Sequence, residues 1–305
     1  MIARNKKIKF PDYLSTGDKV AIVSTARKIG LSEIETSLQL LKMEGFIPVI
    51  GNTIGKASHQ FAGTDQDRAI DLQEKLDDPE IKAIWCARGG YGTVRIIDQL
   101  NFTEFLKHPK WIIGYSDITV LHSYIHNLGI ASLHGPLALD LFKCTHKAID
   151  SFGNMLKGKL EQITIRSSSK NRLGTGVGQL VGGNLSILYS LCGSATSLDM
   201  NGKILCIEDL DEYLYHIDRM LQNLRRNGYF DQLQGLIIGG MNNMHDNAVP
   251  FGKKVKNIIL EVVEAFDFPV VFNFPTGHIS DNRTLVLGAE ISLEVGEEEV
   301  CFRYV

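Results

Sequence analysis

Three side chains in this sequence have the types needed to cleave an acyl bond, and the first is Ser116. It follows the apolar run 111–113 and Gly114, and a helical pattern begins at Ile118. A serine on such a strand-to-helix turn projects from the sheet, beside the free N–H groups of the next helix. This placement suits a nucleophile. The usual G-x-S-x-G signature is only partly matched, because position 118 is isoleucine, and a helix-capping serine is the alternative.

The other two candidates are Glu208, which ends the apolar run 203–207, and His278, which follows Pro-Thr-Gly at 275–277. A hydroxyl is a poor nucleophile until an imidazole takes its proton, and a carboxylate then orients the imidazolium. The chain order Ser, Glu, His is that of α/β-hydrolases. Taken alone, Glu208 is better explained as a surface acid in the acidic stretch 208–212, and His278 as a turn residue.

A glycine-rich loop, Arg-Gly-Gly-Tyr-Gly at 88–92, follows the apolar run 81–87. Glycines let backbone N–H groups converge on an anion, so the loop suits either a phosphate or an oxyanion. It lacks the G-x-G-x-x-G spacing and any Walker lysine, which argues against dinucleotide or P-loop binding. A non-catalytic protein that binds an anion at this loop is therefore an alternative to an enzyme.

His122 and His126, four residues apart in a helical pattern, are a candidate metal pair. The glutamate of the H-E-x-x-H motif is missing, so positions in the core or on the helix surface are favoured. No other ligand set is apparent, and the sequence predicts neither a metal nor a cofactor.

The candidate residues fall near the ends of strands in an alternating pattern of apolar runs and helical segments. The runs are 18–24, 46–50, 81–87, 111–113 and 130–134, and the helical segments are 31–44, 64–78, near 93–100 and 117–128. Such alternation predicts a parallel sheet with helices on both faces, whose ligands bind at the carboxyl ends of the strands.

This alternation stops in a segment with the composition of a linker. We therefore expect an N-terminal α/β domain at 1–145 that carries the nucleophile, a linker at 146–176, and a second domain at 177–305 that carries the Glu and the His. Its expected strands are 203–208, 236–240, 269–272, 284–287, 291–295 and 300–304, of which the last three are antiparallel. Its expected helices are a short one that ends at 191, and two longer ones at 212–226 and 253–265.

Composition narrows the class of protein. The 305 residues are 44% apolar and 22% charged, with a net charge of −3, which argues against a nucleic-acid binder. No apolar run approaches the ~20 residues that span a bilayer, and no signal-peptide core follows the basic segment 1–9. The five scattered cysteines suit reduced core positions. We expect a cytoplasmic protein without nucleic-acid or membrane partners.

Seven motifs, taken in their order, are similar to those of the LD-carboxypeptidase family of serine peptidases, which includes muramoyltetrapeptide carboxypeptidases and microcin C self-immunity peptidases. The resemblance runs through nearly the whole chain. The motifs are Ala87-Arg88-Gly89-Gly90-Tyr91-Gly92, Gly114-Tyr115-Ser116-Asp117, His134-Gly135-Pro136, Gly182-Gly183-Asn184-Leu185, Ile207-Glu208-Asp209, Ile217-Asp218-Arg219 and Pro275-Thr276-Gly277-His278.

The resemblance implies roles for five residues. Ser116 would be the nucleophile, His278 the general base and Glu208 its orienting carboxylate, with the backbone N–H groups of Gly90 and Asp117 as the oxyanion hole. It also implies a Rossmann-like N-terminal domain and a smaller C-terminal domain containing a β-barrel-like sheet, with the site between them. The family does not use the full G-x-S-x-G pattern, so isoleucine at position 118 fits.

The activity implied is that of a metal-independent, homodimeric serine carboxypeptidase. It would hydrolyse the L-D bond to the terminal D-alanine of murein tetrapeptides during wall recycling, with lysine and diaminopimelate equally compatible as the third substrate residue. A rival within the family cleaves peptidyl-nucleotide antibiotics. Those relatives tend to place an aromatic residue for base stacking after the Gly-Gly-Asn-Leu helix, where this chain has Ser190-Leu191-Cys192.

Overall fold

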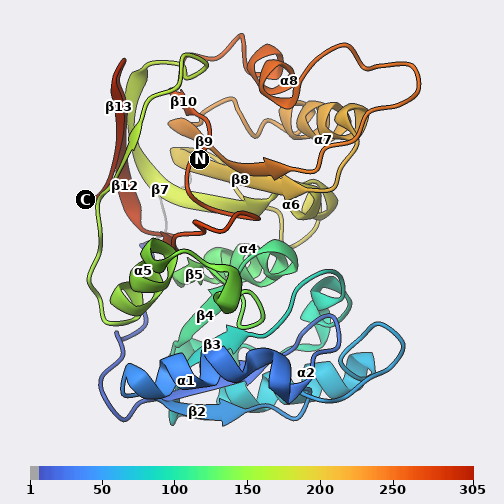
Figure 1. Cartoon of the computed structure of the whole chain (residues 1–305), viewed down its shortest axis with the longest axis vertical. Helices are drawn as coiled ribbons and strands as arrows, with labels where there is room; N and C mark the ends of the chain where they lie inside the picture. Colours follow the sequence, from blue (N-terminus) through green and yellow to red (C-terminus); the bar gives the residue numbers. More distant parts are fainter. Residues whose placement is uncertain (1–6) are drawn as a thin grey trace.

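The computed structural model describes residues 7–305, so most of the basic segment 1–9 lies outside it. Two β-sheets follow one another along the long axis of the molecule, with helices packed around and between them (Figure 1). Both sheets take part in one continuous hydrophobic core that includes Trp85, Trp111, Phe274 and Phe302. The candidate residues lie where the two halves meet.

The first sheet has the strand order β11-β5-β4-β3-β1-β2, in which the last five strands are parallel. Strand β4 is wholly buried and β3 almost so, as expected for apolar runs without polar alternation. The strand order reverses between β1 and β3, and such a switch point is where ligands bind in open parallel sheets. The parallel strands are β1 (Lys19–Val23), β2 (Ile47–Ile50), β3 (Ile81–Cys86), β4 (Trp111–Gly114) and β5 (Ser132–His134).

Five α-helices belong to this half of the chain: α1 (Glu35–Met43), α2 (Asp65–Asp77), α3 (Thr103–Lys107), α4 (Thr119–Leu128) and α5 (His146–Leu156). The region 93–100, expected as one helix, instead forms two 3-10 turns, Thr93–Arg95 and Ile97–Gln99. The reason is a tertiary contact, because the backbone N–H and hydroxyl of Thr93 both donate to the buried carboxylate of Asp117, 24 residues away in the sequence.

The second sheet has the order β10-β9-β8-β7-β12-β13-β6 and is an open sheet, with edges at β10 and β6. The first four strands are parallel and the rest antiparallel. Its strands are β6 (Ile163–Arg166), β7 (Gly174–Asn184), β8 (Lys203–Leu210), β9 (Gly235–Asn242), β10 (Val270–Val271), β12 (Glu290–Val295) and β13 (Glu299–Tyr304), and its helices are α6 (Leu185–Leu191), α7 (Leu214–Arg226) and α8 (Val255–Val262).

Two segments tie the halves together in ways that local patterns did not reveal. The segment 146–176, suggested as a linker, contains α5 and β6. The run 284–287 forms β11 (Leu285–Leu287), which pairs antiparallel with β5 of the first sheet and not with the second sheet. This pairing covers the otherwise open edge of β5. It also anchors the chain just beyond His278 to the sheet that carries Ser116.

The two halves also meet where α4 contacts the end of β7. The hydroxyl of Thr119 accepts a hydrogen bond from the backbone N–H of Asn184 at 2.9 Å. Gly183 has a φ of 139°, and a Cβ there would lie 2.3 Å from the Thr119 hydroxyl oxygen. Only glycine allows this contact. Packing therefore explains the glycine at position 183 of the Gly-Gly-Asn-Leu motif.

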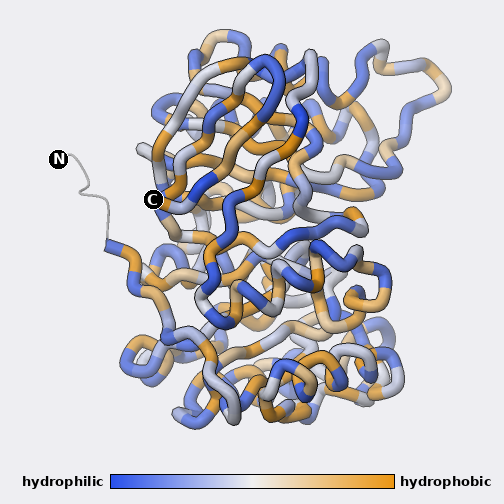
Figure 2. Tube along the Cα trace, turned by 60° about the vertical axis from the view of Figure 1, so that its left-hand side comes forward, coloured by the Kyte–Doolittle hydropathy of each residue, from blue (hydrophilic) through white to orange (hydrophobic). Residues whose placement is uncertain are grey.

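Hydrophobic and hydrophilic residues are interspersed along the trace of residues 7–305 (Figure 2). Within residues 7–305, no helix is both long enough and apolar enough to cross a bilayer.

Candidate active site

Ser116 lies just past the carboxyl end of β4, on a strained turn. Its φ is 63°, in the left-handed region that costs a non-glycine residue on the order of 1–3 kcal/mol. Gly114, two residues earlier, allows the close packing of Ile118, whose Cγ1 lies 2.8 Å from where a Cβ on Gly114 would be. The turn runs directly into α4. The strand, sharp turn and helix predicted around Ser116 are therefore present.

The glycine-rich loop after β3 packs against this turn. A Cβ on Gly89 would lie 3.5 Å from Cβ of Ser116 and 3.6 Å from the backbone N of Asp117. The side chain of Asp117 points away, into the protein, where its Oδ2 accepts from Thr93 N at 2.9 Å and Thr93 Oγ1 at 2.6 Å. Burial raises the pKa of Asp117. The role of this carboxylate is to hold the loop against the turn, while its backbone N–H lies next to Ser116.

Glu208 and His278 form a buried pair although 70 residues separate them in sequence. Glu208 lies near the end of β8 and is fully buried. Its Oε2 is 2.5 Å from Nδ1 of His278 and also accepts the backbone N–H of His278 at 3.1 Å. Two hydrogen bonds to one oxygen fix both the position and the orientation of the imidazole.

The loop that carries His278 is held from several sides. Gly277 has a φ of 92°, and a Cβ there would lie 2.6 Å from Cβ and Cγ of Glu208, so only glycine lets the pair meet. Its N–H donates to Asn282 Oδ1 at 2.8 Å. On the far side, Asn242 Nδ2 donates to the carbonyl of His278 at 2.5 Å. The Pro-Thr-Gly-His motif therefore holds the imidazole in a fixed position.

The electrostatics of the pair are those of an ion pair. Burial by itself raises the pKa of Glu208, but the charge and hydrogen bonds of His278 outweigh it and hold that pKa below its ordinary value. Burial likewise opposes protonation of His278, yet the Glu208 carboxylate raises the pKa of His278 above its usual value. Each partner therefore stabilises the charged form of the other.

A cavity of about 510 Å³ brings most of the candidate residues together. Its lining includes Gly90, Ser116, Asp117 and His278, and Glu208 lies behind the imidazole. The cavity opens at the carboxyl ends of β1, β3 and β4, where the switch point of the first sheet predicted a ligand site. A nucleophile, a histidine held by a buried carboxylate, and backbone N–H groups beside the nucleophile are the parts needed for acyl transfer.

Comparisons with known proteins identify the family of this chain. Family models described as the LD-carboxypeptidase N-terminal domain and the LD-carboxypeptidase C-terminal domain match residues 20–135 and 177–293. The chain belongs to the LD-carboxypeptidase family. It is 34% identical to the probable murein peptide carboxypeptidase of Bacillus subtilis, over 94% of this chain and 92% of that protein.

Two solved structures with this fold resemble the present structure to about the same extent. The muramoyltetrapeptide carboxypeptidase from Oxalobacter formigenes superposes with a TM-score of 0.86 at 24% identity, covering 94% of this chain and 98% of that one. The microcin C7 self-immunity protein MccF, solved in complex with aspartyl sulfamoyl adenosine, gives a TM-score of 0.85 at 24% identity, covering 96% and 98%. The fold alone does not separate these two activities.

The structure of this LD-carboxypeptidase family member also adds residues that sequence patterns did not single out. The ring of Tyr115 packs edge-on against the His278 imidazole, with 4.7 Å between ring centroids, and its hydroxyl donates to Asp140 at 3.0 Å. The buried His134 shares a 3.2 Å hydrogen bond between its Nδ1 and the hydroxyl of Thr276, on the His278 loop. Burial lowers the pKa of His134 to about 4, so this residue stays neutral. Tyr115, His134 and Thr276 belong to the family motifs, whereas Asp140 lies outside them.

One residue of the candidate metal pair, His122, has a structural role instead. The ring nitrogens of His122 bond to Ser132 Oγ at 2.8 Å and to the carbonyl of Gly114 at 2.9 Å. It thereby supports the backbone just before the Ser116 turn, in agreement with the buried position that the sequence allowed for it. Among residues 7–305, no group of three or more His, Cys, Asp or Glu side chains is arranged to hold a metal ion.

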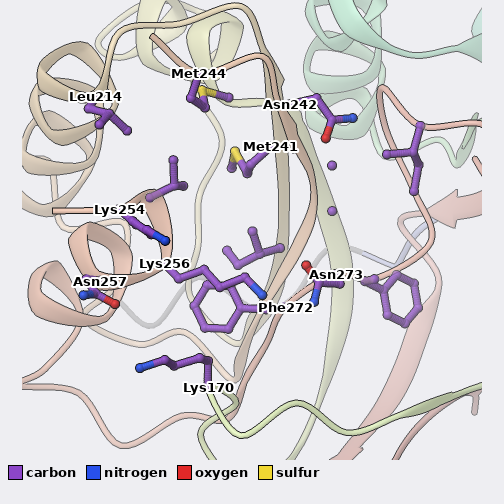
Figure 3. A pocket seen from close by; sticks show the side chains of 16 residues that line it. Lys170, Leu214, Met241, Asn242, Met244, Lys254, Lys256, Asn257, Phe272 and Asn273 are labelled. Carbon is purple, nitrogen blue, oxygen red and sulfur yellow. The ribbon is translucent and has the colours of Figure 1, made fainter. Parts of the chain in front are cut away.

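A second cavity, of about 530 Å³, is shown in Figure 3, and its lining includes Ile279, next to His278 in the chain. Its lining includes Met241, Met244 and Phe272, and Lys256 extends over the Phe272 ring at 5.5 Å. It reaches Asn242, which holds the His278 carbonyl, but contains none of the triad candidates. We therefore take the first cavity as the candidate active site.

Proposed function

We propose that this protein is a serine LD-carboxypeptidase that releases the terminal D-alanine of murein tetrapeptides. The observation that carries the proposal is the buried Glu208–His278 pair, whose imidazole opens into the cavity that also contains the strained Ser116. The family membership supports the reaction class, and the murein substrate is the one in the names of the Bacillus and Oxalobacter relatives.

In this mechanism Ser116 Oγ attacks the carbonyl of the L-residue that precedes D-alanine, and His278 takes the hydroxyl proton. Nδ1 of His278 is occupied by Glu208, which leaves Nε2 as the nitrogen that accepts it. The negative charge that develops on the carbonyl oxygen is stabilised by the backbone N–H groups of Gly90 and Asp117. His278 then returns the proton to the amine of D-alanine as the C–N bond breaks.

The acyl-enzyme is hydrolysed by the same groups in reverse order. His278 removes a proton from water, the hydroxide adds to the ester carbonyl, and the ester bond to Ser116 breaks as the hydroxyl regains its proton. Among the described residues the Ser116 hydroxyl has no hydrogen bond, so its side chain has to turn toward His278 when substrate binds. Such contacts commonly tighten only in the substrate complex.

Incubation of the pure protein with a muropeptide digest, followed by mass spectrometry, tests this proposal. The expected product is a tripeptide that has lost one alanine, and Ser116→Ala should fold normally and lower turnover by on the order of 10⁴–10⁶. Full activity in Ser116→Ala rejects the serine mechanism. Absence of turnover on any peptide favours the alternative of a non-catalytic anion-binding protein.

Three matched peptides test the bond specificity. Tetrapeptides ending in D-alanine should be cleaved, while the L-alanine epimer and the D-Ala-D-Ala pentapeptide should resist, because a misplacement of ~1 Å at the reacting carbonyl can cost about 100-fold in rate. Equal cleavage of the epimer would reject LD specificity while leaving the hydrolase intact. A peptidyl-adenylate analogue in the same assay tests the peptidyl-nucleotide alternative, and light scattering tests the expected cytoplasmic homodimer for its oligomeric state.

A further inference from the structure

Arg27 lies on the loop after β1, at the switch point of the first sheet, and its side chain crosses the glycine-rich loop. Its Cδ and Nε atoms each lie 2.6 Å from the position that a Cβ on Gly90 would occupy. The missing side chain at Gly90, whose φ is 105°, therefore leaves the room that the arginine stem fills. Arg27 rests against the same backbone that carries one of the proposed oxyanion donors.

Two arginines line the active-site cavity, and their guanidinium groups differ in how they are engaged. Arg88 Nη1 donates to the carbonyl of Lys28 at 2.9 Å and lies 3.8 Å from Glu33 Oε1. Arg27 is exposed, and its guanidinium makes no hydrogen bond or ion pair with any residue in the range 7–305. Arg27 is thus a cation beside the nucleophile that is available to an anionic group of the substrate.

The other charges of the cavity restrict where an anionic group can bind. The remaining wall carries the carboxylates of Asp140, Asp209, Asp211 and Glu212. Three of these come from the end of β8 and the loop after it, in the other half of the chain from Arg27. A substrate carboxylate is repelled by that wall and attracted to the arginine side of the cavity.

The chemistry of a carboxypeptidase places such a carboxylate close to the oxyanion site. The terminal carboxyl carbon lies one residue beyond the scissile carbonyl, and a peptide extends by about 3.3–3.6 Å per residue. When the scissile carbonyl oxygen binds the N–H of Gly90, the terminal carboxylate is within one residue's length of that loop. The guanidinium that lies across Gly90 is placed to meet it.

We propose that Arg27 binds the C-terminal carboxylate of the peptide and so restricts hydrolysis to the last peptide bond. The inference rests on the proposed function and adds the group that makes the enzyme an exopeptidase. A planar guanidinium matches a carboxylate with two parallel hydrogen bonds, which fixes the substrate end in both position and direction. Arg27 acts on binding and register, and takes no part in proton transfer.

The test compares a tetrapeptide ending in D-alanine with its C-terminal amide, which keeps the shape and removes the charge. The wild-type protein should prefer the acid by about 10- to 100-fold in kcat/KM, the size expected for charge-assisted hydrogen bonds. Arg27→Gln should lose this preference, with a raised KM on the acid and little change on the amide. Arg88→Gln is the matched control, and it should keep the acid preference because its guanidinium is already engaged.

An Arg27→Gln protein that keeps the acid preference overturns the inference and leaves the hydrolase proposal standing. Loss of rate on acid and amide alike, with a normal circular dichroism spectrum, overturns it as well. If the wild-type protein cleaves neither peptide, the proposed function fails, and calorimetry with Ser116→Ala tests Arg27 separately. Acid binding weakened by the added Arg27→Gln change then supports the carboxylate site, and unchanged binding rejects it.

Discussion

Replacing Glu208 by glutamine tests the mechanism most directly, because it keeps the size of the side chain and removes its charge. In the transition state His278 becomes a cation. Within residues 7–305 its only hydrogen-bonded counter-ion is the buried Glu208 carboxylate, 2.5 Å away. Two unit charges about 4 Å apart attract by about 4 kcal/mol at an effective dielectric constant of about 20. At about 1.4 kcal/mol per tenfold in rate, the loss is on the order of 10³ in kcat/KM.

The same substitution should move the pH profile in a known direction. His278 must be neutral to accept the Ser116 proton, so activity rises with pH through the pKa of His278. Glu208 raises that pKa above its ordinary value, so the wild-type acidic limb should lie above about pH 6.5. In Glu208→Gln the raising charge is gone while burial still lowers the pKa, so the limb should shift to lower pH.

The assay is kcat/KM for the tetrapeptide between pH 4 and 9, in both proteins and in an Asp211→Asn control. Asp211 is an exposed carboxylate of the same cavity whose φ of 64° suits asparagine, so its removal takes away a charge without strain. The acidic limb of the Asp211→Asn profile should stay at the wild-type pH. A limb that stays fixed or moves upward in Glu208→Gln, or a loss below tenfold, would refute the ion-pair reasoning.

Two further predictions concern the metal alternative and the contact between the halves. Chelation with EDTA should leave the peptidase rate unchanged, and a loss that zinc restores would instead revive a metal site at His122 and His126. Gly183→Ala should lower thermal stability, since its Cβ would lie 2.3 Å from the Thr119 hydroxyl oxygen at a φ of 139°. Overpacking of this kind costs about 1–3 kcal/mol of folding free energy. Differential scanning calorimetry should therefore show a melting temperature lowered by several degrees. An unchanged melting temperature would show that the structure accommodates the extra methyl group without cost.

Local sequence patterns were sufficient for most elements of the fold. Buried parallel strands are apolar throughout, and helices follow a period of 3.6, so β1, β3, β4 and the helices α2, α4 and α7 could be located from the residues alone. The turn at Ser116 was also visible, because a glycine between a buried strand and a helix forces a sharp change of direction. These features depend on neighbours in the chain.

The partners of distant segments could not be obtained in this way. The run 284–287 was grouped from the sequence with the antiparallel strands β12 and β13, yet its strand β11 pairs with β5 in the other sheet. Segment 93–100 has a helical pattern, yet its first turn is diverted by the carboxylate of Asp117. In both cases the outcome depends on which edge or charge lies nearby in space, and periodicity carries no information about that.

Some features of the candidate site follow from the sequence, and others depend on tertiary structure. The types of Ser116, Glu208 and His278, and the family to which their motifs are similar, are properties of the sequence. Tertiary structure decides that Glu208 and His278 meet through a glycine at 277, and that Arg27 crosses Gly90 beside Ser116. The physical reason is that these contacts join the ends of strands from separate parts of the chain, and only the packing of the two sheets brings those ends within a few ångströms of each other.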